Sequence, residues 1–398
     1  MLSPQSATTV RATLPVIAGA ITEITARFYD TLFADNPELL RDLFNRGNQA
    51  NGEQRVALAG SIAAFATALV ERPGELPGTM LSRIANKHAS LGVTEEQYAV
   101  VHKYLFGAIG EVLGDAVTPE VGQAWDEVYW LMAETLIGLE RDLYREAGQG
   151  WIHATVIERR DETADVVSLL LRPYTPMSFL PGQYVSVQVT LPDGARQIRQ
   201  YSLSNAPERG DWRITVKRVR GEGAPEGEVS AWLHDHVRAG DVLAVSAPFG
   251  DLTLPGGDGP LLLASAGIGV TPVLSMLDHL AATGSDRRVV VVHADRSPEA
   301  HVHREELADL VAALPGATLH QWYEELPARL ADDPAVAAGR ADLSAIDLPG
   351  DLPGDVVACL CGPLPFMRAV RAQLVERGVP ASGVHYEVFG PDLWIAAA

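Results

Sequence analysis

Cysteine is nearly absent from this sequence. Among 398 residues there are only two, Cys359 and Cys361, both in the segment ACLCGP. This pair excludes a disulfide framework, and we expect no metal site built from these two thiols alone. Scarce cysteine is typical of a reducing compartment. The N-terminal segment has no basic stretch followed by a long apolar core, so we expect no signal peptide and a cytoplasmic protein.

Positive charge and long apolar runs are also scarce. The chain has 31 Lys and Arg residues against 51 Asp and Glu, which gives a formal net charge of -20 and a pI near 4.9. An acidic surface repels phosphate backbones, so nucleic acid is excluded as a partner. No stretch approaches the roughly 20 uncharged apolar residues of a membrane span. We therefore expect a monomer without an integral membrane segment that acts on small molecules.

The sequence divides into three parts, and the first has a helical pattern. Across residues 1–147, apolar residues recur at spacings of three and four, and Pro and Gly separate the segments. The series at positions 10, 14, 17, 21, 24 and 28 is one example, and the series from position 125 to 139 is another. Such spacing predicts amphipathic helices, so the first part is expected to be an all-α domain.

The other two parts have strand patterns of different kinds. Residues 151–255 contain β-rich stretches at 166–171, 184–189 and 212–219, separated by Pro and Gly turns, which predict a small antiparallel β-barrel. In residues 256–398, apolar strands at 261–265, 288–293 and 356–361 alternate with helical segments. Strand–helix alternation predicts an α/β domain with a parallel sheet. The fold class is therefore multidomain: all-α, then β-barrel, then α/β.

A histidine of the first part lies on an apolar helix face. His88 ends the segment 81–88, in which Leu81 and Ile84 share its face. Taken alone, such a histidine is more often a packed or surface residue than a metal ligand. It is preceded, however, by an ordered series of short motifs: Phe28-Tyr29, Asn36-Pro-Glu-Leu39, Phe44-Asn45 and Asn51-Gly-Glu-Gln-Arg55, followed by Lys87-His88.

This ordered series resembles the globin domain of the flavohaemoglobins, over nearly all of residues 1–145. In that bacterial nitric oxide dioxygenase family, a globin is fused to a reductase similar to ferredoxin–NADP reductase. The resemblance implies that His88 is the proximal ligand of the iron of haem b. It also implies that Tyr29 hydrogen-bonds iron-bound O2, whose developing negative charge a donor stabilises. Without the resemblance, Tyr29 is better interpreted as a core tyrosine.

The resemblance implies roles for further residues around the haem. Phe44 would pack on the haem face, Gln54 would assist Tyr29, and Leu58 would narrow the distal space. Tyr98 and Glu140 match the family's pair beside the proximal histidine, where a carboxylate increases the electron density that the imidazole gives the iron. Lys87 would tune the haem potential. On the sequence alone, Glu140 is equally a solvated helix residue and Lys87 a surface lysine.

Three motifs of the second part resemble the FAD-binding barrel of the ferredoxin-reductase-like family. They are Pro181-Gly-Gln-Tyr184, Arg199-Gln200-Tyr201-Ser202-Leu203 and Gly227-Glu-Val-Ser230. By this resemblance Arg199 contacts the pyrophosphate, for which its fork is suited. Tyr201 and Ser202 would meet the isoalloxazine, and Tyr184 would lie near the adenine. Ser230 would stand at the start of a helix over 231–236, whose N-terminus suits an anion. The middle motif is short enough to occur by chance, but its place between the others argues against chance.

Two glycine-containing motifs of the third part resemble the nicotinamide-binding signatures of the same reductases. The segment Ser265-Ala-Gly267-Ile268-Gly269-Val270-Thr271-Pro272 follows an apolar strand and lacks the third glycine of the dinucleotide fingerprint. Its glycines let the backbone approach a pyrophosphate. Cys361-Gly362-Pro363 is the second signature, with Cys361 near the nicotinamide rather than acting as a nucleophile. A plain buried thiol is the alternative.

The C-terminal motif Tyr386-Glu387-Val388-Phe389-Gly390-Pro391 completes the resemblance, which thus extends to about residue 391. Phe389 would cover the flavin until nicotinamide displaces it, and Glu387 would bear on the flavin and haem potentials. Some relatives have cysteine where this chain has Val388, a neutral difference. Arg296 is either a contact of a 2′-phosphate or a surface residue, so the choice between NADH and NADPH stays open.

The combined resemblance implies an electron path from NAD(P)H through FAD to haem, where NO and O2 are converted to nitrate. FAD is needed because hydride carries two electrons and haem accepts one. Two other functions remain open at this point. The chain could be an NAD(P)H oxidase or a flavin or ferric reductase, or a sensor or store for O2 or NO. The attached reductase argues against the store, and Tyr29, Gln54 and Glu140 argue weakly against the oxidase.

Overall fold

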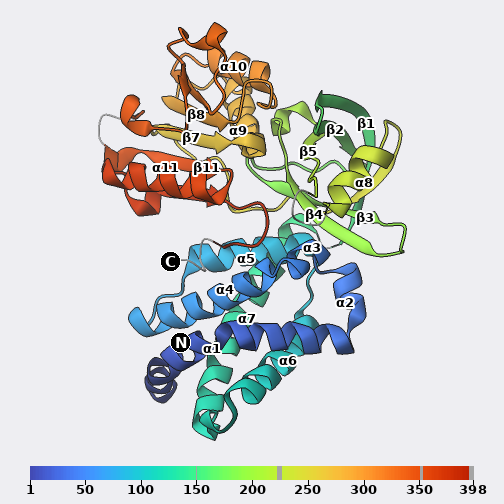
Figure 1. Cartoon of the computed structure of the whole chain (residues 1–398), viewed down its shortest axis with the longest axis vertical. Coiled ribbons are helices and arrows are strands. Elements are labelled where there is room, and N and C mark those ends of the chain that lie inside the picture. Colours follow the sequence, from blue (N-terminus) through green and yellow to red (C-terminus); the bar gives the residue numbers. More distant parts are fainter. Residues whose placement is uncertain (149, 222–225, 350–352, 394–398) are drawn as a thin grey trace.

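The three parts of the chain form three bodies that meet at the centre of the molecule (Figure 1). The computed structural model describes residues 1–148, 150–221, 226–349 and 353–393. The N-terminal helices form one end, and the barrel and the parallel sheet lie side by side at the other. The chain leaves the last strand of the parallel sheet and returns to the helices, so its C-terminal end lies beside them.

The first body is an all-α domain, as expected. Its core is formed where α1 packs against α4, α6 and α7, with Ile24, Phe28 and Phe65 fully buried. The helices are α1 (Pro4–Asp35), α2 (Pro37–Asp42), α3 (Arg46–Ala50), α4 (Glu53–Glu71), α5 (Gly78–Leu91), α6 (Glu95–Leu113) and α7 (Pro119–Ala147). Within the described residues, no helix joins the length and the apolar character that crossing a bilayer would require.

Local capping explains where several of these helices begin. The Ser3 hydroxyl accepts a hydrogen bond from the Ser6 amide at 3.2 Å, and proline follows at the first helical position of α1. Helix α6 begins with a capping box between Thr94 and Gln97, whose side-chain oxygen accepts the Thr94 amide at 3.0 Å. Helix α5 ends at Gly92, which has a φ of +76°.

The second body is a closed antiparallel barrel. Its strand order is β4-β3-β6-β1-β2-β5, and a bridge between Leu203 and Ile214 joins the two edges. Closure removes the free edges of the sheet, and inward-facing residues such as Trp212 and Val187 fill the interior. The elements are β1 (Ile152–Thr163), β2 (Val166–Pro173), β3 (Tyr184–Thr190), β4 (Arg196–Ser202), β5 (Trp212–Lys217), α8 (Glu228–His236) and β6 (Val242–Val245).

The third body is a parallel sheet of order β10-β9-β8-β7-β11-β12 between two helical layers. Helix α9 packs with α10 on one face, and α11 covers the other. Its central strand β7 is buried at every position, as parallel strands usually are. The elements are β7 (Leu261–Ala266), α9 (Val270–Ala282), β8 (Val289–Asp295), α10 (Arg304–Ala312), β9 (Ala317–Tyr323), β10 (Val336–Ala338), β11 (Val357–Cys361), α11 (Leu364–Glu376) and β12 (Val384–Glu387).

The fold class expected from the sequence is thus confirmed, with differences in detail. The strand expected to end at residue 219 ends at Lys217, where the chain turns toward α8. Helix α8 begins at Glu228, three residues before the expected start at residue 231, because Gly227 serves as its N-cap. Ser230 therefore lies inside the first turn of the helix.

Gly182, just before β3, allows the barrel to approach α9. A Cβ atom at this position would lie 2.3 Å from the Leu252 carbonyl oxygen and 2.7 Å from the Met276 methyl group, and its φ is +106°. Gly194 has a φ of +81°, but a Cβ atom there would meet no other atom within 4 Å. We expect Gly182→Ala to be less stable than Gly194→Ala by about 1–3 kcal/mol, because the first change adds overpacking to backbone strain.

Thermal unfolding followed by circular dichroism measures this difference, with both variants compared with the parent chain. Equal melting temperatures for the two variants would show that the close approach at Gly182 does not constrain the packing of the barrel on α9.

Candidate functional site

His88 is held by a carboxylate and a phenol from two other helices. Its Nδ1 lies 2.8 Å from Glu140 Oε1 on α7 and 3.0 Å from the Tyr98 hydroxyl on α6. The Tyr98 hydroxyl in turn donates to Glu140 Oε1 at 2.5 Å. Burial, followed by the nearby Glu140 charge, raises the pKa of Tyr98 far above its usual range, so Tyr98 stays a donor. The structure thus brings together three residues that the sequence placed 10 to 52 positions apart.

This triad fits a haem ligand. Since Tyr98 donates to Glu140, the carboxylate also accepts the Nδ1 proton of His88, and that tautomer leaves the Nε2 lone pair for iron. Glu140 is 3 % exposed, so it is not a solvated surface residue. Within the described residues, no group of three or more His, Cys, Asp or Glu side chains could hold a metal ion by itself.

Tyr29 and Phe44 lie together on another side of the helical domain. Tyr29 is 2 % exposed, and its ring meets the Phe44 ring edge-on with centroids 5.9 Å apart. Phe33, which the sequence analysis did not single out, contacts both rings. Burial raises the pKa of Tyr29 far above its usual range, against a smaller opposing effect of the Gln54 amide. The hydroxyl is therefore a proton-bearing donor at neutral pH.

An ion pair fixes the helix that carries Gln54 and Leu58. Arg55 donates to Asp30 Oδ1 at 2.7 Å, and these residues are the direct neighbours of Gln54 and Tyr29. Helix α4 is thereby tied to α1 close to Gln54 and Tyr29, whose side chains hydrogen-bond. Half-buried Leu58 packs on the core one turn further along α4. The sequence analysis missed this pair because nothing in the two motifs that contain Asp30 and Arg55 indicates that these residues meet.

The expected flavin residues lie on paired strands of the barrel. Ser202 on β4 is directly opposite Tyr184 on β3, and Gln200 donates to Ser186 on β3 at 2.9 Å. The Ser202 hydroxyl is buried without a hydrogen-bond partner, as expected of a group that meets a ligand. Two residues before the half-buried Tyr201, Arg199 donates to the Ile198 carbonyl at 2.7 Å. Burial lowers the pKa of Arg199.

Two of the flavin candidates also have structural contacts. Ser230 in α8 donates to the Gly227 carbonyl at 3.0 Å and accepts the Val219 amide at 3.1 Å, so it ties the start of the helix to the segment after β5. Tyr184 packs against Ala89 of α5, with the Lys87 amino group 6.0 Å from its ring centroid. Its position relative to an adenine stays a prediction.

The two expected nicotinamide motifs touch each other. The first forms a short turn at Gly267–Gly269 and leads into α9, whose Thr271 hydroxyl donates to the Ile268 carbonyl at 3.0 Å. A Cβ atom on Gly269 would lie 2.3 Å from the Cys361 carbonyl oxygen, so only glycine allows this contact. Such a glycine cradle at the start of a helix fits a pyrophosphate. Val270 and Pro272 are buried in α9, whereas Pro363 is exposed at the start of α11.

Three motif ends lie in one row across the parallel sheet. Cys361 on β11 is paired with Ser265 on β7 and with Glu387 on β12. The carboxyl ends of parallel strands are the usual edge for a nucleotide. Burial, followed by the nearby Glu387 charge, raises the pKa of the Cys361 thiol well above its usual range. Arg296 is exposed just after β8.

The C-terminal motif lies between the sheet and the helical domain. Glu387 is 8 % exposed, and its Oε2 has no hydrogen-bond partner. Burial raises the pKa of Glu387 and lowers that of half-buried Lys87, while their mutual attraction opposes both shifts. After the half-buried Val388, Phe389 is 47 % exposed, and Gly390 and Pro391 follow with the backbone turned at a Gly390 φ of +123°.

Arg83, five residues before His88 on α5, joins all three bodies and was missed by the sequence analysis. Its guanidinium lies 3.7 Å from Asp251 of the barrel and 3.1 Å from Asp392 near the C-terminal end. It also donates to the Tyr386 carbonyl at 3.1 Å and stacks over the Tyr386 ring at 3.9 Å. Asn86 on the same helix accepts the amide of Gly250, next to Asp251, at 2.8 Å.

A second junction joins the helical domain to the barrel alone. Arg46 in α3 pairs with Asp193 at 2.6 Å and with Glu228 of α8 at 2.7 Å. Asp42 in α2 accepts from Arg196 on β4 at 3.1 Å, and the hydrogen bonds of arginines hold its pKa well below its usual range. The strand of the flavin motif is thus flanked by ion pairs to the helical domain.

Comparison with known protein families divides the chain in the same way. The Globin family model matches residues 26–136, the oxidoreductase FAD-binding domain matches residues 153–254, and the oxidoreductase NAD-binding domain matches residues 263–372. These domains, with the residues described above, identify haem, FAD and a nicotinamide dinucleotide as the cofactors.

Curated relatives and one solved structure match nearly the whole chain. A flavohemoprotein of Bordetella parapertussis is 44% identical over 407 residues, covering 98% of this chain and 99% of the relative. One from Rhizobium meliloti is 39% identical and covers 99% and 100%. The crystal structure of flavohemoglobin from Malassezia yamatoensis with bound FAD and heme is 38% identical, with a TM-score of 0.88 over 98% of this chain and 100% of that chain. The chain therefore belongs to the flavohemoprotein family.

Proposed function

We propose that this flavohemoprotein is a nitric oxide dioxygenase, which converts NO and O2 to nitrate with electrons from NAD(P)H. We assign the haem, FAD and nicotinamide parts of the reaction to residues 1–147, 151–255 and 256–398. A solved FAD/NAD-binding domain of a nitric oxide dioxygenase from Vibrio cholerae supports the proposal. It is 36% identical to this chain, with a TM-score of 0.55 over 60% of this chain and 99% of that domain.

The observation that carries the proposal is the triad of His88, Glu140 and Tyr98. The cofactors supply a two-electron donor, a carrier of single electrons and an iron that binds O2. Glu140 holds the Nδ1 proton of His88 at 2.8 Å, and this hydrogen bond gives the imidazole anionic character. Reversible storage needs no such electron donation, whereas a reaction of O2 gains from it. Tyr98 fixes the carboxylate so that the ring orientation is kept.

Tyr29 supplies the polar group on the distal side. Burial raises its pKa and keeps the hydroxyl protonated, and the Gln54 side chain hydrogen-bonds it, so Tyr29 would supply a donor to a ligand of the haem. The surrounding rings of Phe33 and Phe44 exclude water and hold the phenol in place. Leu58 adds an apolar wall on α4.

The reductase side chains bind and orient. Arg199 would supply positive charge and the start of α8 would supply backbone amides for the flavin pyrophosphate. Ser202, whose hydroxyl has no hydrogen-bond partner, would contact the flavin ring. The Gly267–Gly269 turn receives the nicotinamide dinucleotide beside Cys361. Lys87 and Glu387 lie on opposite sides of the junction between the helical domain and the sheet, where a charge of either sign influences electron transfer.

Replacing Tyr29 by Phe tests the distal assignment. We expect faster O2 dissociation and NO consumption lowered by roughly 10- to 100-fold, the value of a hydrogen bond to a charged group. NO consumption is followed with an electrode and O2 release by stopped-flow absorbance. Tyr104→Phe is the control, because its hydroxyl donates only to Asp35 at the surface. A Tyr29→Phe protein with the parent's NO consumption and O2 release would remove Tyr29 from the mechanism.

Replacing His88 by Ala separates the dioxygenase from the alternatives. We expect loss of haem ligation and of NO consumption, while NAD(P)H-dependent reduction of ferricyanide through FAD is retained. The control is His102→Ala, since His102 pairs with Asp126 away from Glu140. If His88→Ala still consumes NO at the parent's rate, the reductase does the work and the dioxygenase proposal is wrong. If the parent itself is reduced but consumes no NO, the oxidase or sensor function is favoured.

Replacing Arg83 by Ala tests the three-domain junction. We expect reduction of the flavin by NADH to be unchanged and electron transfer from flavin to haem to fall by at least ~10-fold, since small displacements of reacting groups are costly. Anaerobic stopped-flow absorbance separates the flavin and haem signals. Arg145→Ala is the control, with a side chain 70% exposed at the end of α7. Unchanged haem reduction would limit Arg83 to a role in stability.

A further inference from the structure

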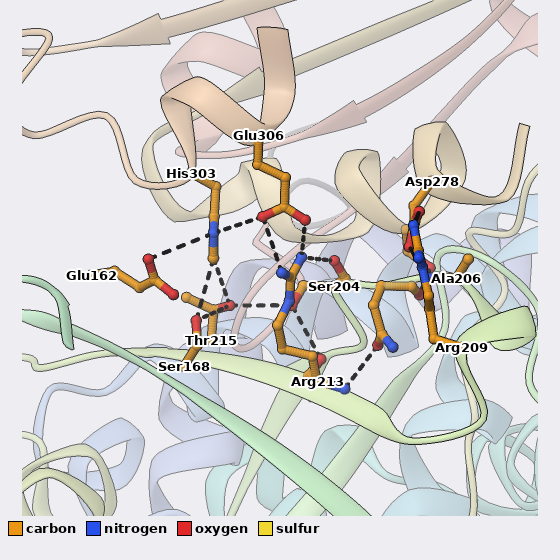
Figure 2. Close-up of polar contacts among 12 residues, drawn as sticks. Glu162, Ser168, Ser204, Ala206, Arg209, Arg213, Thr215, Asp278, His303 and Glu306 are labelled. Atoms are coloured by element: carbon orange, nitrogen blue, oxygen red, sulfur yellow. Dashed lines mark hydrogen bonds and ion pairs between the residues drawn. The ribbon is translucent and has the colours of Figure 1, made fainter. Parts of the chain in front are cut away.

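A polar cluster joins the barrel to helix α10 of the parallel-sheet domain (Figure 2). Arg213 on β5 donates to both carboxylate oxygens of Glu306, at 3.0 and 2.8 Å. Its Nε donates to the Ser204 hydroxyl at 3.0 Å, and it also donates to the Ser204 carbonyl. Against the effect of burial, hydrogen bonds from His303 and Arg213 hold the pKa of Glu306 at about 2, so the pair stays ionic.

His303 extends the cluster from an unusual backbone conformation. Its φ of +56° is the sole positive value of a non-glycine residue in the described ranges, and it precedes α10 as N-cap. The ring reaches across the interface, with Nε2 3.0 Å from the Thr215 hydroxyl and Nδ1 3.0 Å from Glu306 (Figure 2). Left-handed conformations cost energy for a residue with a side chain, so the interface contacts maintain this one.

Helix α9 is held to the barrel independently. Asp278 is 4 % exposed and accepts the Ala206 amide at 2.8 Å and two guanidinium nitrogens of Arg209 at 2.6 and 3.2 Å. The buried Ser275 hydroxyl donates to the Asn205 carbonyl at 2.8 Å. Helix α9 is therefore fixed to the segment that follows β4, and α10 is linked to the same segment through Arg213 on β5.

These contacts are close in sequence to both candidate cofactor sites. The segment of Ser204 to Ala206 begins two residues after Ser202, the flavin candidate at the end of β4. Helix α9 begins directly after the Gly267–Gly269 turn. A displacement at the cluster reaches this segment through the bond of Arg213 to Ser204, and it reaches α9 through the bonds of Asn205 and Ala206, so it changes the position of one ring relative to the other. Hydride transfer requires the reacting atoms to be about 3–3.5 Å apart.

We propose that the cluster of Ser204, Arg213, His303 and Glu306 is a positioning device that sets the rate of hydride transfer from nicotinamide to flavin. In that step the C–H bond at C4 of NAD(P)H breaks, its electron pair goes with the hydrogen to N5 of the flavin, and NAD(P)+ and reduced flavin result. The residues act through the orientation of the two domains, which the cluster fixes at α10 while the Asp278 and Ser275 contacts fix it at α9. The inference rests on the FAD and nicotinamide parts of the proposed function and not on NO chemistry.

The test uses the full chain loaded with haem and FAD. Glu306→Ala and the isosteric Glu306→Gln are mixed with NADH under anaerobic conditions, and the flavin band is followed over a series of NADH concentrations. We expect the limiting rate of flavin reduction to fall by at least ~10-fold, with the NADH concentration for half-maximal rate changed by less than ~2-fold. Arg213→Lys, which keeps the charge but loses the fork, should give an intermediate rate.

A matched control and a second measurement separate positioning from general stability. Glu299→Ala removes an ion pair with Arg329 that is exposed and lies within the sheet domain, so it should leave the rate unchanged. Hydrogen–deuterium exchange without nucleotide should increase in residues 212–217 and 304–312 of both Glu306 variants, and not in Glu299→Ala.

Two outcomes overturn the proposal. One is an unchanged limiting rate in a folded Glu306 variant. The other is a fall in rate accompanied by weaker NADH binding and a lower melting temperature. That combination indicates a purely structural role. Because the readout is the flavin band, a chain that fails to consume NO yet shows the rate effect disproves the dioxygenase and supports the positioning device.

Discussion

In the proposed function, electron transfer between the domains depends on how α5 is held, because this helix carries His88 and contacts both other bodies. Arg83 is the interaction on which that arrangement depends. Its guanidinium is 12 % exposed and lies between Asp251 and Asp392, so loss of the arginine would leave two carboxylates together at a junction with little water. A Lys in its place would keep the charge but not the planar group that stacks on Tyr386 and donates in several directions.

The same chemistry recurs at every domain boundary. Arg46, Arg196, Arg209 and Arg213 each pair with a carboxylate of another domain, in a chain with 31 basic and 51 acidic residues. Surface ion pairs contribute little to stability, but bidentate arginine–carboxylate pairs have a defined geometry. They fix orientation rather than add much binding energy. An oxidoreductase that passes electrons between domains needs that property more than it needs strong association.

The predictability of each residue depended on how far away its partner lies in the sequence. The nicotinamide turn could be predicted because Gly267 and Gly269 act within one continuous segment after an apolar strand. His88 and Glu140 could be predicted only from the order of several motifs. Arg213 and Glu306 lie 93 positions apart and belong to no pattern, since a lone arginine or glutamate is usually a solvated surface residue. Their meeting depends on the packing of two domains, which no local spacing encodes.

A rigid junction must still let a nicotinamide reach the flavin, and the C-terminal tail shows how both are compatible. Arg83 holds the tail at two points, the Tyr386 carbonyl and the Asp392 carboxylate. Between them lies Phe389, 47 % exposed, followed by Gly390 with a φ of +123°. A segment fixed at both ends can move an exposed side chain by local rotations without releasing either contact. The tail can thus keep α5 in place while its aromatic side chain moves, as the role expected for Phe389 requires.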